Sequence, residues 1–228
     1  MRPIWIATCA LAVIGAFFVV LQAAWMLKVQ AEWLPYPAQV LGAALAGLVV
    51  SRAAAGSIRA AFVAGAAAVI VLALISYALP RAFTLTAVRS PHALIVVPIL
   101  VIASGAACAL AARVPAPPSA VWLPMSAAFV AACTIQLGGR LAHVAGLPAE
   151  PTALVAFGIA AALVAGLNIR ALVRSECARE VAIGVLALML WGTLAQVVLR
   201  SAAALTIWDV LLLVGAPLGA AIGARVRI

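Results

Sequence analysis

Long uncharged stretches follow one another along the chain, and the short segments between them hold almost all of its charges. Seven stretches contain no Asp, Glu, Lys or Arg: 3–27, 33–51, 60–80, 90–112, 114–139, 151–169 and 181–199. An eighth, 201–224, contains a single charge, Asp209. An α-helix rises about 1.5 Å per residue, so about 20 apolar residues cross the hydrocarbon core of a bilayer. The pattern predicts eight transmembrane helices, or seven if the last stretch does not cross.

The stretches are typical of helices and not of barrel strands. Runs such as ALIVVPILVIASGAACALAA are apolar on every side, whereas barrel strands alternate apolar and polar residues. Hydrophobic residues make up 68% of the chain and charged residues 8%, against about 25% charged residues in a soluble domain. We therefore predict an all-α, polytopic integral membrane helix bundle, with the lipid bilayer as its main partner and an uncleaved first helix.

The basic residues are divided unequally between the two sides that eight crossings would create. One side holds nine basic and two acidic residues, and the other holds five basic and three acidic residues. Because cytoplasmic loops collect Lys and Arg, both termini are expected in the cytoplasm. The net charge of +9 is thus explained by topology, and no nucleic-acid partner is expected. The predicted location is the cell membrane, as a multi-pass protein of a bacterial inner membrane.

The chain is expected to form one transmembrane domain, 1–228, with a proline-rich segment (RVPAPPSA, 113–120) at its middle. This segment suggests two halves of four helices each, 1–113 and 119–228. A shift of 119 residues pairs Gly65 with Gly184 and Pro98 with Pro217, although such identities are few for so alanine-rich a sequence. Halves that run in the same direction would be parallel repeats, an architecture found among transporters.

Glycines four residues apart mark the last apolar stretch, in GAPLGAAIG. A phosphate-binding loop would need a preceding strand and a Lys or Ser/Thr at a set position, and neither is present. Small residues four apart instead line one face of a helix and let another backbone approach closely. The predicted packing residues are Gly158, Ala162, Gly166, Gly215, Gly219 and Gly223. A homodimer through the last helix is the alternative to packing within the chain.

A few polar side chains fall toward the outer ends of the predicted helices. They are Gln22, Gln39, Tyr77, Gln136, Gln196 and Asp209. Polar groups in lipid are costly, so these residues could line a pocket open to the outside. The simpler interpretation is helix-to-helix hydrogen bonding. Asp209 is solvated if its helix begins near Trp208, and submerged if the helix begins near Ala202.

Signals of catalysis are absent from the sequence. It contains no H-E-x-x-H or G-x-S-x-G motif, and none of the four cysteines lies at metal-ligand spacing from another cysteine or a histidine. We therefore expect no enzyme, no catalytic residue, no cofactor and no metal. Cys177 is expected in a cytoplasmic loop, where it should be open to labelling.

Two functions fit this composition. The leading hypothesis is a non-catalytic, membrane-embedded scaffold or accessory subunit that acts through helix packing, with other membrane subunits or a second copy as partners. The alternative is a small transporter or permease for a neutral or amphipathic solute, with an outward-facing polar pocket. Superimposable halves, together with outer glutamines that face one cavity, would favour the permease.

Overall fold

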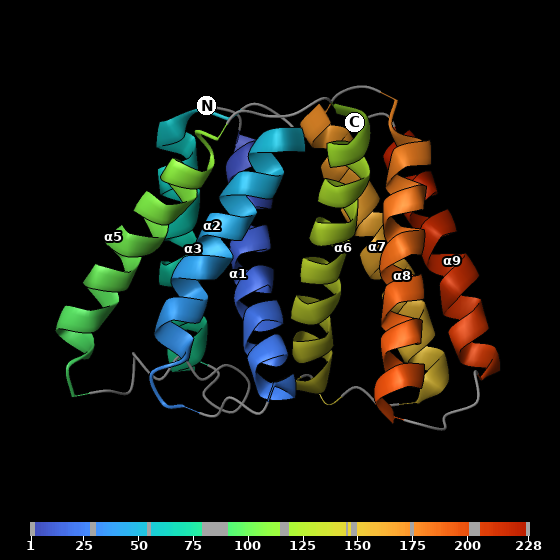
Figure 1. The fold of residues 1–228 in the computed structure, drawn as a ribbon, viewed down its shortest axis with the longest axis horizontal. Helices are drawn as coiled ribbons and strands as arrows, with labels where there is room; N and C mark the ends of the chain where they lie inside the picture. Colours follow the sequence, from blue (N-terminus) through green and yellow to red (C-terminus); the bar gives the residue numbers. More distant parts are fainter. Residues whose placement is uncertain are drawn as a thin grey trace. The chain divides into compact units, whose positions relative to one another are not determined.

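Every secondary-structure element in the described part of the chain is an α-helix (Figure 1). The computed structural model describes residues 3–27, 31–53, 56–78, 91–114, 119–144, 146, 150–173, 176–200 and 206–226. The eight helices within these ranges are α1 Pro3–Met26, α2 Pro35–Ala53, α3 Ile58–Ala78, α5 Ala93–Ala111, α6 Ser119–Val144, α7 Pro151–Val173, α8 Ala178–Arg200 and α9 Ile207–Arg225. The prediction of an all-α bundle is confirmed.

Within the described residues, five of these helices are both long and apolar enough to cross a membrane. They are α1, α3, α5, α7 and α9, and α6 adds a shorter apolar stretch, Val121–Ile135. Many of their large apolar side chains are exposed, which in water would be unfavourable but in lipid is the expected state. The chain is an integral membrane helix bundle.

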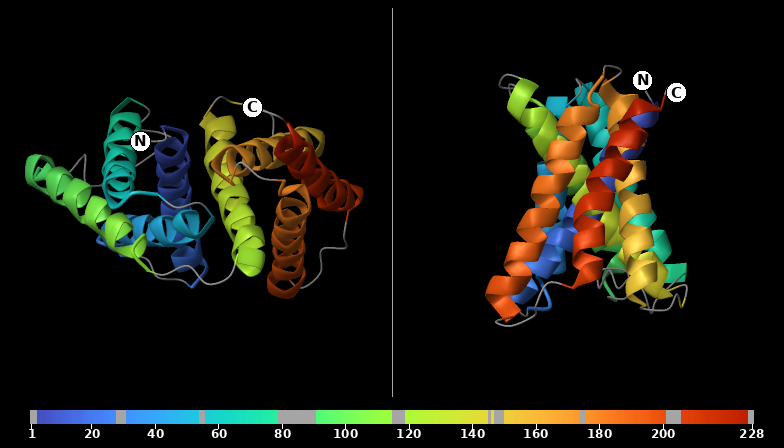
Figure 2. Two further views of the ribbon diagram at one scale, coloured as in Figure 1. Left: turned by 90° about the horizontal axis from the view of Figure 1, so that it is seen from above. Right: turned by 90° about the vertical axis from the view of Figure 1, so that its right-hand side faces the viewer.

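The chain divides into two compact units, residues 1–117 and 118–228. We call them the N-terminal unit and the C-terminal unit, and each contains four of the described helices (Figure 2). In the N-terminal unit, α1 and α5 each pack on both α2 and α3, while α2 and α3 meet only slightly. In the C-terminal unit, α6 and α9 each pack on both α7 and α8, while α7 and α8 meet only slightly. When the described helices of each unit are counted along the chain, the same pairs of helices therefore pack together in both units.

Cys108 on α5 lies where the four helices of the N-terminal unit come together. Its backbone carbonyl contacts α2 at Gly47, where a Cβ atom would overlap it. Its own Cβ lies 2.9 Å from the position that a Cβ at Gly65 on α3 would take. Its Sγ lies 3.7 Å from the Sγ of Cys9 on α1. Two glycines and a small side chain thus let three helices approach α5 at one level.

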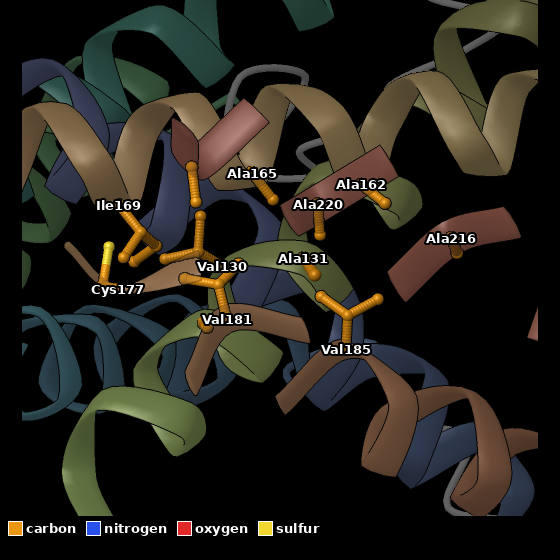
Figure 3. Close-up of a cluster of buried hydrophobic side chains, with 12 residues drawn as sticks. Val130, Ala131, Ala162, Ala165, Ile169, Cys177, Val181, Val185, Ala216 and Ala220 are labelled. Atoms are coloured by element: carbon orange, nitrogen blue, oxygen red, sulfur yellow. The ribbon is translucent and has the colours of Figure 1, made fainter. Parts of the chain in front are cut away.

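The core of the C-terminal unit consists almost wholly of small and branched aliphatic side chains (Figure 3). Val130 of α6, Ile169 of α7 and Val181 of α8 are its larger members, and all are almost completely buried. Alanines from α6, α7 and α9 fill the remaining space, as Figure 3 shows for Ala131 and Ala220. Because alanine projects so little from the backbone, the helix axes can lie close together.

Glycine allows α7 and α9 to approach each other closely. A Cβ at Gly166 on α7 would overlap the backbone carbonyl of Ala220 on α9. In the opposite direction, a Cβ at Gly223 on α9 would overlap the carbonyl of Leu163 on α7. Each helix therefore sets its backbone against the backbone of the other.

The remaining members of the predicted packing set lie along the same contact. A Cβ at Gly219 would lie 3.0 Å from the carbonyl oxygen of Ile159, and one at Gly215 would lie 2.6 Å from the Cδ1 atom of the same residue. A Cβ at Gly158 would lie 2.5 Å from a methyl carbon of Leu212, and Ala162 is fully buried. The glycines of the last helix thus face α7 within the chain, so a dimer would need another face of α9.

Prolines lie inside three of the helices without ending them: Pro98 in α5, Pro124 in α6 and Pro217 in α9. Each removes one backbone N–H from the helical ladder and leaves a carbonyl short of its partner. The carbonyl of Pro124 lies against α8 at Gly184, where a Cβ would overlap it. These helices continue through their prolines, as a kink would allow.

A cluster of five charged residues lies at 170–180 in the sequence, around the end of α7 and the start of α8. α7 continues to Val173, and α8 begins at Ala178, so the cluster consists of two helix ends and the four residues between them. Cys177, just before α8, is fully buried against the core of the C-terminal unit. Burial raises the pKa of its thiol, an effect that Arg170 partly offsets. The expectation that Cys177 is open to labelling is therefore wrong.

Replacing Gly223 with alanine is expected to destabilise the fold, because the new methyl group would meet the carbonyl of Leu163. Overpacking of this kind costs about 1–3 kcal/mol. For a chain of this length, each kcal/mol lowers Tm by roughly 2–4 °C. Gly192→Ala on α8 is the matched control, since nothing lies within 4 Å of a Cβ there. Thermal unfolding in detergent should separate the two variants, and equal Tm values would contradict the close packing of α7 and α9.

The membrane orientation can be measured with cysteines placed at exposed positions. Glu176→Cys should react with a membrane-impermeant maleimide only from the cytoplasmic side, and Glu150→Cys only from outside, since both residues are exposed. The native Cys177 should contribute little background, because a raised pKa leaves little of the reactive thiolate at neutral pH. Labelling of Glu176→Cys in intact cells would reverse the predicted topology.

Candidate functional site

The residues of the predicted polar pocket are divided between the two units. Gln39 and Tyr77 lie in the N-terminal unit and Asp209 in the C-terminal unit. The side chains of the other three fall outside the described part of the structure: Gln22, Gln136 and Gln196. The pocket as a whole therefore stays a prediction, and its three described members can be considered one at a time.

Gln39 is the most unusual polar side chain in the N-terminal unit. It lies on the fifth residue of α2, which begins at Pro35 in the position where a missing N–H costs nothing. Its side chain is fully buried, and neither its Oε1 nor its Nε2 has a hydrogen-bond partner among the described residues. An unpaired buried amide is unfavourable by about 1–3 kcal/mol. The N-terminal unit thus holds a donor and an acceptor that its own described side chains do not use.

Three residues after Gln39, α2 makes a close contact that fixes the position of this part of the helix. A Cβ at Gly42 would lie 2.8 Å from the backbone nitrogen of Phe17 on α1. Ala38 and Ala43 are buried on either side. The backbone that carries Gln39 is therefore held against α1, so the amide cannot reach solvent without movement of the helices.

Tyr77 does not share this environment. It lies in the last turn of α3, and 81% of its surface is exposed. An aromatic ring with a polar tip at the end of a membrane helix is typical of the bilayer interface. Tyr77 is therefore explained by its position at a membrane surface and does not extend the polar interior around Gln39.

Asp209 forms the N-terminal cap of α9 together with Thr206. The carboxylate Oδ2 accepts hydrogen bonds from the backbone N–H of Thr206 at 2.8 Å and from its hydroxyl at 2.7 Å. In return, the Thr206 Oγ1 accepts a bond from the backbone N–H of Asp209. This capping box pairs N–H groups that a helix start leaves free. Since α9 begins at Ile207, the structure fits the interfacial alternative for Asp209.

A feature that sequence reasoning missed lies at the end of the N-terminal unit where α3 begins and α5 ends. There a groove of about 640 Å³ opens between the two helices. Its lining includes apolar side chains of both helices and two arginines, one in α3 and one just after α5: Arg59, Phe62, Val63, Ala106, Leu110 and Arg113. The signal in the sequence is the pair of arginines, one opening the third predicted span and one closing the fourth.

The local sequence explains why both arginines lie at one end. Ser57 caps α3, because its Oγ accepts a hydrogen bond from the backbone N–H of Ala60, so Arg59 falls in the first turn. Arg113 comes two residues after the end of α5, in a turn where its own N–H bonds to the carbonyl of Leu110. Both arginines are exposed, and neither forms an ion pair or side-chain hydrogen bond with a described residue.

The thiols and acids of the described residues do not form a metal centre. No group of three His, Cys, Asp or Glu residues among them lies close enough to hold an ion. Cys9 and Cys108 are the one close thiol pair within this part of the structure, and both are buried in the N-terminal unit. Their role in helix packing follows from the contacts of Cys108 described above.

Comparison of the chain with protein-family models, with curated proteins and with solved structures finds no significant match. Two features of the chain's own geometry bear on its function: the buried amide of Gln39 and the pattern of helix contacts that the two units share.

Replacing Gln39 with methionine, which has a similar length, is expected to raise the free energy of unfolding in detergent by about 1–3 kcal/mol, because it removes an unpaired buried amide. Tyr77→Phe, which removes an exposed hydroxyl, should leave stability unchanged. Chemical unfolding of the two variants and the parent measures the difference. A clear loss of stability in Gln39→Met would mean that the amide has a structural partner in the folded protein.

Proposed function

We propose that the protein is a small permease for a neutral or amphipathic solute. One observation supports this proposal over a scaffold: the same pairs of helices, counted along each unit, pack together in both units. With four described helices in each unit, the chain enters and leaves each unit on the same side. A parallel duplication produces two such units, and transporters are often built in this way. A scaffold that only offers a packing surface has no need of such a repeat.

The spacing of the elements gives a second reason to treat the units as copies. Four residues separate α2 from α3, and four separate α7 from α8. Arg59 is the second residue of α3, and Arg179 is the second residue of α8. A shift of about 120 residues therefore aligns the start of α3 with the start of α8, and Arg59 with Arg179. Few side-chain identities accompany this match, as an old duplication in an alanine-rich sequence would leave.

Gln39 supplies the polar contact that a permease of this kind needs. Its amide can both donate and accept a hydrogen bond, so it can pair with a hydroxyl, an amide or a carboxyl group of a solute. It carries no charge, and the N-terminal unit contains only one acidic residue, Glu32, which precedes α2. A neutral or amphipathic solute with one polar end fits this chemistry better than a metal cation does.

The scaffold hypothesis retains one supporting observation. Along α9, several large apolar side chains are exposed, as at Leu211, Leu218 and Ile222. Such a face can contact either lipid tails or an apolar helix of another subunit. A bundle with no transport activity and a stable partner on this face would fit the scaffold instead.

The permease proposal predicts saturable uptake by the full-length protein in liposomes. The probes are radiolabelled leucine, hexanol and octanoate, which cover neutral amino acids, alcohols and amphipathic acids. Gln39→Met should lower the uptake rate of the transported probe about tenfold, because one lost hydrogen bond of about 1.4 kcal/mol is a factor of ten. Tyr77→Phe is the matched control and should transport normally.

Protein-free liposomes and liposomes with heat-unfolded protein set the background for this assay. Uptake that rises linearly with concentration for all three probes, in liposomes that contain folded protein, would contradict the proposal. Normal uptake by Gln39→Met would leave the permease in place and remove Gln39 from its solute path.

A further inference from the structure

The groove between α3 and α5 combines an apolar wall with two arginines at its rim that pair with no described residue. Phe62 forms part of the wall because Gly105 on α5 has no side chain, and a Cβ there would lie 2.9 Å from the Cε2 atom of the ring. Phe62 and Leu110 remain 39% and 61% exposed within the groove. The volume of about 640 Å³ is within the usual range of small-molecule sites, about 300–1,000 Å³.

Within the N-terminal unit, the described residues provide no counter-ion for the charges at this rim. In residues 1–117 the only acidic side chain is Glu32. It precedes α2, whereas α3 begins beyond the other end of α2, so the length of a membrane helix separates Glu32 from Arg59. Arg59 and Arg113 lie at helix ends, where membrane arginines extend toward the headgroups. The site thus places two positive charges near the ends of membrane helices, beside an apolar groove.

We propose that this groove binds an anionic phospholipid of the surrounding leaflet. The lipid phosphate lies between the guanidinium groups of Arg59 and Arg113, and one acyl chain lies along Phe62, Val63 and Leu110. Arginine suits this role because its planar group donates two parallel hydrogen bonds to phosphate oxygens. Basic pockets between transmembrane helices bind such headgroups. This site is independent of the proposed transport, and no solute need pass through it.

The experiment uses full-length protein in detergent with increasing amounts of dioleoyl phosphatidylglycerol or dioleoyl phosphatidylcholine. Native mass spectrometry counts the retained lipids, and Tm measures their stabilising effect. Arg59→Gln with Arg113→Gln should lower phosphatidylglycerol affinity about fivefold for each arginine, roughly 25-fold together, with little change for phosphatidylcholine. Arg179→Gln is the matched control, an exposed arginine at the same position of α8.

A second variant, Ala106→Phe, separates the groove from surface charge. It fills the groove and keeps both arginines, so it should lose phosphatidylglycerol selectivity while its Tm without lipid confirms that it folds. An equal loss in Arg179→Gln would overturn the proposal in favour of bulk charge. Full selectivity in Ala106→Phe would overturn it because the acyl chain would then lie elsewhere. Dissociation of a dimer by Ala106→Phe would assign the groove to a second copy of the chain.

Discussion

In lipid, two apolar helices gain little by leaving their solvent, so the fold depends on how closely their backbones approach. Dispersion contacts fall off steeply with distance, and small residues are what allow them to form. The α7–α9 contact meets this requirement from both sides, with Gly166 against the carbonyl of Ala220 and Gly223 against that of Leu163. In the N-terminal unit the same requirement is met around Cys108, where Gly47 and Gly65 admit α2 and α3.

The same solvent explains why Asp209 and Gln39, two polar side chains near helix starts, lie in different environments. Asp209 is a charged group, and the chain places it in the first turn of α9, where Thr206 donates two hydrogen bonds to it. Gln39 is neutral and lies one turn deeper in its helix, fully buried, without a partner among the described residues. A charge in that position would be far more costly, so an amide is the strongest polar group that the N-terminal unit can hold there unpaired.

The sequence was sufficient to predict the helices and the small-residue faces, because both follow from local patterns. Uncharged length identifies a membrane helix, and glycines four apart identify one face of it. The partner of a face is not local information: Gly42 faces α1, and Gly105 faces Phe62 of α3. The arginine groove was missed for this reason, since Arg59 and Arg113 become neighbours only when α3 packs on α5.

The relation between the two halves was also beyond the sequence, because alanine-rich chains match one another by chance. The shift of 119 residues pairs Pro98 with Pro217, yet Pro98 is the sixth residue of α5 and Pro217 the eleventh of α9, so this pairing is out of register with the helix starts. The starts of α3 and α8 agree instead at a shift of 120. The pattern of helix contacts that the two units share supports a repeat more strongly, since it does not depend on composition.

If the units are copies, their differences show where each has specialised. Arg59 and Arg179 occupy the same place in α3 and α8, but Arg59 is followed by Ala60, whereas Arg179 lies between Glu176 and Glu180. The two glutamates provide the C-terminal unit with negative charge at the helix start, and the N-terminal unit has none there. The two glutamates at the start of α8 would repel a phosphate, whereas at the start of α3 a phosphate would meet only positive charge. The same arrangement of helices can thus bind an anionic headgroup in the N-terminal unit and exclude it from the C-terminal unit. The difference lies in the acidic residues at the start of α8, Glu176 and Glu180.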